Sequence, residues 1–209
     1  MKTSKNMIPT IFKTLHASDL VELENIYEDW DDYENDVIQL AGYVGHIVST
    51  EMILKYLKNT KSKILDAGCG TGLAGDILYK NDYKNIIGAD FSQKMLDRAL
   101  KKNIYQSLSL CDLTQKLDFE DNFFDAIVCA GTFTCGHVGP EALYEMVRIT
   151  KKEGYISFTV RKQEWEASPY EKIIKDLENS MLWSKIEHHT SDYNTQEGIS
   201  CQLCLYQVI

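Results

Sequence analysis

The chain of 209 residues is poor in proline, poor in basic residues and free of long apolar runs. Its three prolines are widely spaced, and no apolar stretch approaches the ~20 residues that a membrane-spanning helix needs. Among the first twenty residues, Lys2, Lys5 and Lys13 stand without a continuous apolar segment, so we expect no secretory signal. Repeats and low-complexity segments are also absent. These features favour a single globular domain and exclude a membrane protein.

Positive charge is scarce. The chain has 22 Lys and Arg against 31 Asp and Glu, a formal net charge of −9. Sequence-independent binding to nucleic acid needs clustered Lys and Arg to neutralise phosphates. Nucleic acid is therefore disfavoured as a partner, and a small molecule or a cationic protein segment is the easier ligand.

The cysteines do not form a disulfide framework or a metal site. They are Cys69, Cys111, Cys129, Cys135, Cys201 and Cys204. Their scatter predicts free thiols and a cytoplasmic protein. Cys201 and Cys204 lie three apart in a predicted strand, where they point to opposite faces, and the neighbours His188 and His189 diverge in the same way. No Cys/His cluster has zinc spacing, so we expect no metal.

From residue 63, short apolar runs alternate with amphipathic segments, which is typical of βαβ units in an α/β fold with a parallel sheet. Strands are predicted near 63–67, 85–90, 105–110, 124–130, 154–160, 183–190 and 199–209. Helices are predicted over 72–80, 92–102, 140–151 and 169–181. Only a loop separates the last two strands, which predicts a closing antiparallel hairpin.

The N-terminal part, residues 1–58, differs from the domain at 59–209. We expect a mobile tail through Ala17 without periodicity. Ser18 and Asp19 then cap a helix, and a second helix is predicted from Asp36 to Leu57.

The most informative segment is the apolar run at 64–67 with the glycine turn that follows it, Gly68-Cys69-Gly70-Thr71-Gly72. Glycines let the backbone pass close to a ligand at the carboxyl end of a strand. Asp90 ends the next apolar run, where a carboxylate accepts hydrogen bonds from ribose hydroxyls. The pattern predicts a cofactor that contains adenosine.

The spacing also indicates which cofactor is bound. A dinucleotide turn needs a third glycine where this chain has Leu73, and no Gly-Lys-Ser/Thr follows to cradle phosphates. Asp66, just before the turn, is poorly placed for a pyrophosphate but suits a cationic amino-acid tail. S-adenosyl-L-methionine has an ammonium, a sulfonium and a ribose without phosphate, so it is the predicted cofactor. The alternative is that Asp66 and Asp90 only cap turns and bind no cofactor.

Three motifs carry a resemblance to a known family. Asp66–Gly72 resembles the first signature of the class I S-adenosylmethionine-dependent methyltransferases, Gly88–Leu96 the second and Phe124–Val128 the fourth. The resemblance covers roughly residues 60–160. It implies a Rossmann-like sheet of seven strands, mostly parallel with the last strand antiparallel, and helices on both faces.

A narrower resemblance extends beyond these motifs. Tyr27-x-x-Trp30-x-x-Tyr33-Glu34-x-Asp36-Val37, the run 108–113 and Gly136-His137-Val138 are similar to the methyltransferase-like proteins of the Williams–Beuren region group. One departure is local: the family usually has Lys-Pro-Gly-Gly before the fifth strand, where this chain has Lys152-Glu153-Gly154-Tyr155.

The predicted cofactor residues come from the ends of four strands and from the N-terminal part. They are Tyr33, Asp66, Gly68, Cys69, Gly70, Gly72, Asp90, Phe91, Met95, Cys111, Asp112, Leu113 and Ala130. Asp90 is assigned to the ribose, and Phe91 and Met95 to the adenine faces, although both side chains also suit a core. The family pattern implies a bond from the adenine amine to Asp112, which is otherwise a solvated loop acid.

Few side chains suggest proton transfer. His137 follows the fourth predicted strand, and the unperturbed pKa of a histidine side chain, near ~6.5, suits a general base, although a loop histidine without catalytic duty is equally consistent. Tyr33 and Tyr43 are candidates for the mouth of the site. Arg161 ends the fifth strand, where it either binds an acidic group of the methyl acceptor or forms a surface ion pair.

The segment between residues 22 and 36 carries eight carboxylates, and aromatic residues at 27, 30, 33 and 43 lie in and just beyond it. We interpret it as a lid that packs rings over the cofactor while its acids face water; a permanently docked helix is the alternative. The predicted function is transfer of a methyl group to an unidentified, small-molecule acceptor, by a monomer or homodimer. A non-catalytic subunit that binds adenosylmethionine is the second hypothesis, and a nicotinamide dehydrogenase a distant third.

Overall fold

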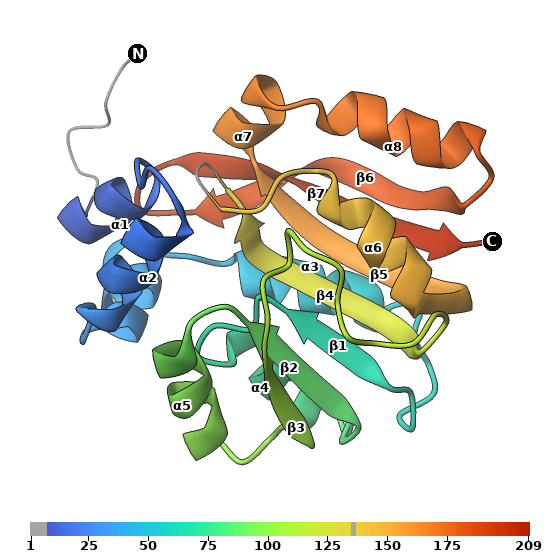
Figure 1. Ribbon diagram of the computed structural model, residues 1–209, viewed down its shortest axis with the longest axis horizontal. Helices are drawn as coiled ribbons and strands as arrows, with labels where there is room; N and C mark the ends of the chain where they lie inside the picture. Colours follow the sequence, from blue (N-terminus) through green and yellow to red (C-terminus); the bar gives the residue numbers. More distant parts are fainter. Residues whose placement is uncertain (1–7, 135–136) are drawn as a thin grey trace.

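The computed structural model describes residues 8–134 and 137–209 (Figure 1). Cys135 and Gly136, which the sequence analysis included among the thiols and in a motif, lie outside these residues. The described residues form a seven-stranded sheet in the order β3-β2-β1-β4-β5-β7-β6. Its strands are β1 (Ile64–Ala67), β2 (Ile86–Asp90), β3 (Ser107–Leu110), β4 (Phe124–Phe133), β5 (Thr150–Arg161), β6 (Trp183–Asn194) and β7 (Ile199–Val208).

The sheet is parallel except at one strand. β1, β2, β3, β4 and β5 pair in parallel, whereas β7 runs antiparallel to both β5 and β6. All four residues of β1 are buried, as expected for the central strand of a sheet covered on both faces. The predicted fold class, including the antiparallel last strand, is confirmed.

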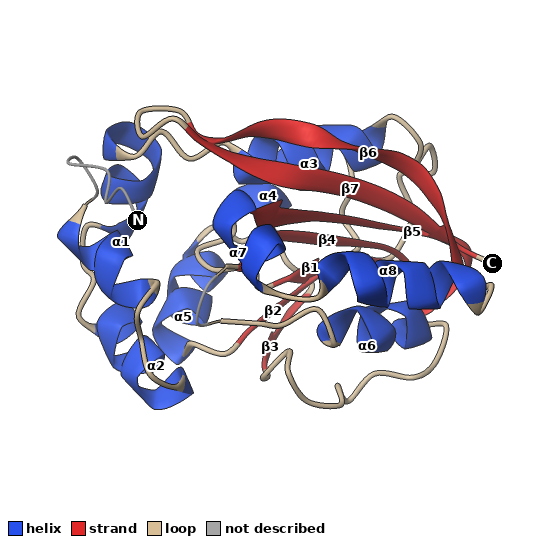
Figure 2. Ribbon diagram, turned by 90° about the horizontal axis from the view of Figure 1, so that it is seen from above, coloured by secondary structure: helices blue, strands red, loops and turns tan. Residues whose placement is uncertain are grey.

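Helices cover both faces of the sheet. They are α1 (Pro9–Thr14), α2 (Leu20–Glu28), α3 (Gly45–Leu54), α4 (Leu73–Lys80), α5 (Gln93–Lys101), α6 (Ala142–Ile149), α7 (Lys162–Ala167) and α8 (Tyr170–Asn179), with a π-helix η1 at Asn35–Leu40. Figure 2 shows α3 on one side of the strands and α6 and α8 on the other. Among the described residues, no helix has the length and hydropathy of a membrane span.

The core is divided by the sheet into two clusters. Met52 and Ile53 of α3 pack with Leu78 of α4 on one face. On the other face, Leu143 of α6 and Leu177 of α8 pack with the larger cluster. In α6, buried residues recur at three- and four-residue steps, so one apolar stripe faces the strands.

The predicted long helix from Asp36 to Leu57 is wrong. The segment forms η1, breaks, and resumes as α3. Gly42 causes the break because its φ is 70°, in the left-handed region, and a Cβ there would lie 2.3 Å from Thr195 Oγ1. The next residue, Tyr43, pairs with Asn194 at the end of β6. The N-terminal part is thereby joined to the sheet.

Three further expectations need correction. The segment through Ala17 was expected to be mobile and without periodicity, but helix α1 begins at Pro9, with proline in its first turn, a favoured position. Helix α7 was not predicted, because its six residues carry no clear period. Strand β5 begins at Thr150 and has an irregular register against β4 before Tyr155. Glu153 there has φ 65°, a conformation that proline, the family's usual residue at this position, cannot adopt.

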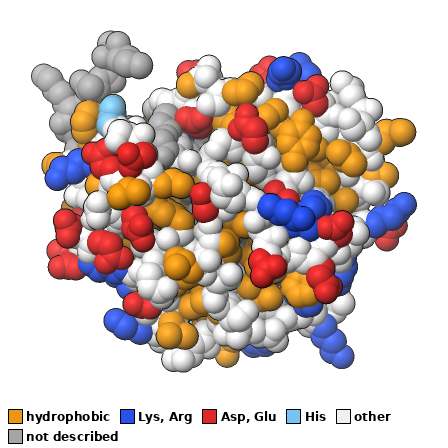
Figure 3. Space-filling model, viewed as in Figure 1, with side chains coloured by type: hydrophobic (Ala, Val, Ile, Leu, Met, Phe, Trp, Pro, Cys, Tyr) orange, Lys and Arg blue, Asp and Glu red, His pale blue; other side chains and the backbone are white. Residues whose placement is uncertain are grey.

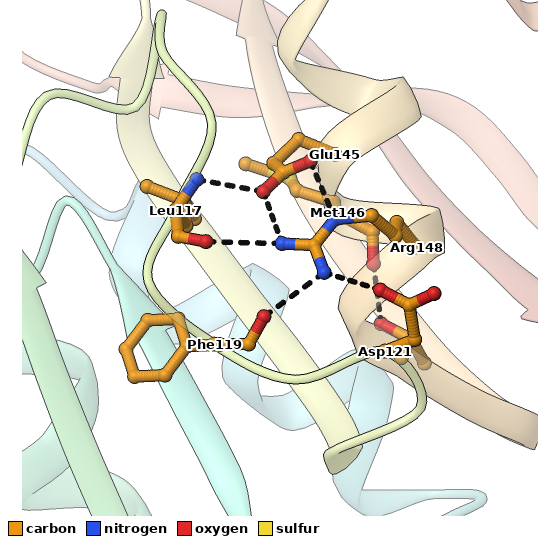
Figure 4. Close-up of polar contacts among 7 residues, drawn as sticks. Leu117, Phe119, Asp121, Glu145, Met146 and Arg148 are labelled. Atoms are coloured by element: carbon orange, nitrogen blue, oxygen red, sulfur yellow. Dashed lines mark hydrogen bonds and ion pairs between the residues drawn. The ribbon is translucent and has the colours of Figure 1, made fainter.

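Arg148 of α6 holds the long connection between β3 and β4 (Figure 4). Its guanidinium donates to the carbonyls of Leu117 and Phe119 at 3.0 and 2.9 Å and pairs with Asp121. Glu145, one turn earlier, binds Arg148 and also accepts from the backbone N–H of Leu117 at 2.7 Å. A segment with no regular structure is thus fixed near the amino ends of β4 and β5, where Asn122 N also donates to the carbonyl of Arg148 at 2.9 Å.

Candidate functional site

A cavity lies at the carboxyl ends of the strands and is closed by the N-terminal helices. Every predicted cofactor residue except Gly72 lines it, and so does His137. The carboxyl ends of parallel strands meet at one edge of the sheet, which explains why residues from β1, β2, β3 and β4 converge there.

The glycines of the turn at 68–72 differ in what surrounds them. Gly68 and Gly70 have φ of 70° and 51°, in the left-handed region. A Cβ on Gly68 would lie 2.0 Å from Thr132 Oγ1, whereas the atom nearest to a Cβ on Gly70 is Tyr33 Oη at 4.0 Å. Gly70 therefore presents bare backbone to the open cavity. Gly72 instead begins α4, and a Cβ there would meet the ring of Tyr105 at 3.1 Å, so it serves packing outside the cavity.

Asp66 is buried at the end of β1 and lines the cavity. Its Oδ2 accepts from the backbone N–H of Gly75 at 2.9 Å and from Tyr105 Oη at 2.6 Å. Burial raises the pKa of this carboxyl to about 6, because the charged form loses solvation. The two hydrogen bonds partly offset that effect and join β1 to α4.

Asp90 ties the glycine turn to the end of β2. Its Oδ2 accepts from Gly70 N at 2.8 Å, and its Oδ1 accepts from Ser92 N at 3.0 Å. Burial raises its pKa as well. Ser92 in turn caps α5 by accepting from Met95 N. The carboxylate is held rigidly beside the backbone of Gly70, where the ribose was predicted.

The residues assigned to the adenine lie along the same wall. Met95 is buried and Phe91 is half-buried, yet both line the cavity, so a core role and a ligand-facing role coincide. Asp112 follows β3 and accepts from Thr114 N at 2.8 Å through Oδ1. The backbone N–H of Cys111 donates to the carbonyl of Asp90 at 2.9 Å, which keeps these two chain segments together.

An aromatic cluster from the N-terminal part covers this wall. The ring of Tyr27 lies 5.8 Å from Phe91 and 6.0 Å from Tyr33, between centroids. Trp30 lies 4.9 Å from Tyr33, edge to face. The Oη of Tyr27 is hydrogen-bonded to Nε2 of His137 at 3.0 Å, so the cluster also contacts the loop after β4.

A basic stripe on α5 binds the acidic N-terminal segment. Three cations at four-residue steps make the contacts: Lys94 with Asp31 at 3.1 Å, Arg98 with the carbonyl of Trp30 at 2.8 Å, and Lys102 with Glu34 at 2.9 Å. Figure 3 shows carboxylates gathered over the N-terminal helices on the left. Asp31 and Glu34 face water, as expected, with 89% and 46% of their side chains exposed, and each also pairs with a cation of this stripe.

Beyond β4, the cavity contains polar atoms that the sequence analysis largely missed. The buried atoms without a hydrogen-bond partner include Tyr43 Oη, His46 Nδ1, Thr71 Oγ1, Thr134 Oγ1 and Arg161 Nε, and all five residues line the cavity. Burial lowers the pKa of His46 to about 4, so its ring is neutral at pH 7. No motif surrounds His46 or Thr134, so the sequence offered no signal for them.

Arg161 corrects an earlier expectation. It is 3% exposed, so it is not at the surface, and its side chain has no ion pair with any described residue. The thiols, in contrast, stay inert: burial raises the pKa of Cys111 to about 11 and of Cys129 and Cys201 to about 12. Within residues 8–134 and 137–209, no group of three or more His, Cys, Asp or Glu is arranged to hold a metal ion.

Comparison with known proteins agrees with this geometry. Residues 65–158 match the sequence family described as a methyltransferase domain. The fold is similar to a TehB-like SAM-dependent methyltransferase from Corynebacterium glutamicum, with a TM-score of 0.62 and 18% identity, over 88% of this chain and 98% of that one. Residues 65–158 therefore carry a methyltransferase domain, in a fold similar to that of SAM-dependent methyltransferases.

Two sequence relatives are named as particular methyltransferases or methyltransferase-like proteins. Methyltransferase-like protein 27 of Homo sapiens is 33% identical over 147 residues, which is 68% of this chain and 59% of that protein. The chain thus spans about three fifths of that relative, whose name agrees with the methyltransferase-like resemblance. An 18S rRNA (guanine-N(7))-methyltransferase of Bos taurus is 40% identical over 65 residues, 31% of this chain and 23% of that protein.

Proposed function

We propose that the protein transfers the methyl group of S-adenosylmethionine to a small-molecule acceptor. The observation that carries the proposal is the extent of the cavity. It runs from Asp90 and Asp112, where an adenosine is expected, past Ala130 to Arg161 and Tyr193. Buried polar atoms without partners lie at this second end. Such atoms are costly unless a ligand or water binds them, so this end of the cavity offers hydrogen-bonding groups to a second molecule.

Four features of the chain fit the cofactor. Asp90 would accept from the ribose hydroxyls, and the bare backbone at Gly70 allows the amino-acid part to approach. Phe91 and Met95 would contact the adenine ring, and the carboxylate of Asp112 would accept a hydrogen bond from its exocyclic amine. When bound, the cofactor supplies an electrophilic methyl on a sulfonium, so the protein contributes mainly orientation and exclusion of water.

His137 is our proposal for the group that accepts a proton when the acceptor is protonated. It lines the cavity, and its Nε2 contacts the Oη of Tyr27 at 3.0 Å. Burial raises the pKa of Tyr27, so the phenol keeps its proton at neutral pH. The contact between Tyr27 and His137 also joins the N-terminal part to the loop after β4. If His137 only held the N-terminal part in place, turnover would not depend on its imidazole once that part is docked.

The proposed acceptor is a small molecule for two reasons. The cavity is covered by the aromatic cluster of the N-terminal part, which a folded RNA would have to displace. The net charge of −9 also opposes contact with a phosphate backbone. The match to the rRNA methyltransferase spans only 65 residues of this chain, so it does not reach across the whole cavity.

Thermal shift with S-adenosylhomocysteine tests cofactor binding. A ligand at 100 times its dissociation constant stabilises the folded protein by ~2.7 kcal/mol. Asp90→Ala should abolish the shift, whereas Asp97→Ala, on the exposed side of α5, should retain it. A shift with NAD and none with adenosylhomocysteine would end the proposal.

Turnover is tested separately. Methyl-labelled S-adenosylmethionine is incubated with the protein and either a pool of small metabolites or total RNA. We expect label in the metabolite pool and a lower rate for His137→Ala with unchanged binding of adenosylhomocysteine. Binding without label in either pool would favour the non-catalytic hypothesis, and label in RNA would replace the small-molecule acceptor.

A further inference from the structure

Arg161 is the feature of the cavity that neither the cofactor nor the fold explains. It is the last residue of β5, it lines the cavity, and it is 3% exposed. Its Nε is buried without a hydrogen-bond partner, and no described carboxylate lies within ion-pair distance. A buried guanidinium without a partner is strongly disfavoured, because its solvation is lost and nothing replaces it. An anionic ligand group would supply the missing partner.

The place of Arg161 in the sheet separates it from the cofactor. The predicted cofactor residues follow β1, β2, β3 and the middle of β4, whereas Arg161 pairs with Cys201 of β7 on the far side of β5. β5 lies two strands from β1, a distance of about 10 Å at the usual strand spacing. Ala130, which was predicted to contact the cofactor, and Gly131 lie between them, on β4. Arg161 is therefore on the acceptor side.

Two segments distant in sequence build the wall around it. Thr195 N donates to the carbonyl of Gly42 at 2.9 Å, and Val44 N donates to the carbonyl of Tyr193 at 2.8 Å. These contacts place the rings of Tyr43 and Tyr193 edge to face, 5.1 Å apart. The wall is aromatic, and both hydroxyls lie near Gly131: a Cβ there would be 2.7 Å from Tyr43 Oη and 3.8 Å from Tyr193 Oη.

The charges on the cavity indicate which anion fits. Arg161 is the only Lys or Arg among the described residues that line it, and His46 is neutral. Asp66, Asp90 and Asp112 line the opposite end. A phosphate dianion would keep excess negative charge near these carboxylates, whereas one guanidinium neutralises one carboxylate and matches its two oxygens in a planar fork.

We propose that Arg161 binds the carboxylate of the methyl acceptor, and that the acceptor is a small aromatic or apolar monocarboxylic acid whose body packs against Tyr43 and Tyr193. The inference rests on the proposed function, since it names the substrate class of the same site. It assigns Arg161 a role in specificity, with the carboxylate as an anchor.

The test measures binding without turnover. Benzoate and cinnamate, with benzamide and cinnamamide as neutral controls, are titrated into the protein saturated with S-adenosylhomocysteine, and binding is followed by ligand-observed NMR. We expect the wild-type protein to bind the acids at least about tenfold more tightly than the amides, the effect of one charge-assisted contact. Arg161→Met should bind acids and amides alike, and Arg161→Lys should fall between.

Arg161→Met removes a buried charge at similar volume, so it should fold at least as stably as the wild type. Its affinity for adenosylhomocysteine should stay within about a factor of two, less than 0.5 kcal/mol. A tenfold loss would assign Arg161 to the carboxylate of the cofactor and overturn the proposal. An unchanged acid preference in Arg161→Met, no acid binding by the wild type, or equal binding of inorganic phosphate would also overturn it.

The same titrations without adenosylhomocysteine separate this inference from the proposed function. If adenosylhomocysteine fails to bind the wild type, the methyltransferase proposal fails. Acid binding that depends on Arg161 would then still show a carboxylate site. If adenosylhomocysteine binds and the acids do not, only the inference about the acceptor fails.

Discussion

Replacing Asp66 by asparagine should make the stability of the protein less dependent on pH. Asp66 has a pKa of about 6 in the folded state, against 3.8 for an unperturbed aspartate, because burial disfavours its charge. The folded protein therefore binds more protons than the unfolded chain between these values. The contribution of Asp66 to stability is therefore fully present below pH 4 and is lost as the pH rises through about 6.

The size of the effect follows from the shift. Two pKa units correspond to about 3 kcal/mol, which is equivalent to about 6–12 °C in Tm for a domain of this size. The amide oxygen of the introduced asparagine would still accept from Gly75 N and Tyr105 Oη, so little else changes. Relative to the wild type, Asp66→Asn should gain up to about 3 kcal/mol between pH 4 and pH 7.

Urea unfolding followed by tryptophan fluorescence at pH 4.5 and pH 7.5 measures this difference. Asp76→Asn is the matched control, because Asp76 follows Gly75, which donates to Asp66, but pairs with Lys80 at the surface. For Asp76→Asn we expect the difference in unfolding free energy from the wild type to be the same at both pH values. The reasoning is refuted if the gap between wild type and Asp66→Asn is the same at both pH values.

Two further predictions concern the turn and the lid. Gly70→Ala should fold with a cost of about 1–2 kcal/mol for its φ of 51° and lose adenosylhomocysteine in calorimetry, because the new methyl enters the cavity. Gly75→Ala should instead lower Tm, because its Cβ would lie 2.3 Å from Tyr105 Oη; equal effects of the two variants would contradict this assignment. Arg98→Ala should speed hydrogen exchange across residues 20–44, since it loses the contact with Trp30, and adenosylhomocysteine should restore protection. Exchange that neither the substitution nor the ligand changes would mean that the N-terminal part is permanently docked.

Local chemistry made much of the site predictable. The turn at 68–72 and the carboxylates Asp66 and Asp90 follow buried strands, and the carboxyl ends of parallel strands must converge. The order of elements was therefore sufficient to group residues from four strands at one edge. The motif did not predict that Gly72 lies outside the cavity. Gly72 belongs to the same run, but a Cβ there would face the ring of Tyr105, which lies more than thirty residues further along the chain.

The N-terminal part was harder to predict. The apolar period from Asp36 to Leu57 indicated one helix, but Gly42 adopts a left-handed conformation in which the chain meets Thr195. That contact joins segments 153 residues apart, and no local propensity encodes it. The same is true of the basic stripe on α5, whose partners lie more than sixty residues earlier.

The sequence by itself determined the sheet, the glycine turn and the carboxylates beside it, because these depend on short-range patterns and on the direction of parallel strands. Only the tertiary structure decided the far end of the cavity. Arg161, Tyr43 and Tyr193 come from three elements with no shared motif, and whether a charged side chain is buried without a partner depends on everything that surrounds it. Burial is a property of the assembled chain, so the sequence offered Arg161 and Tyr43 as candidates but could not show that Arg161 is buried at the cavity.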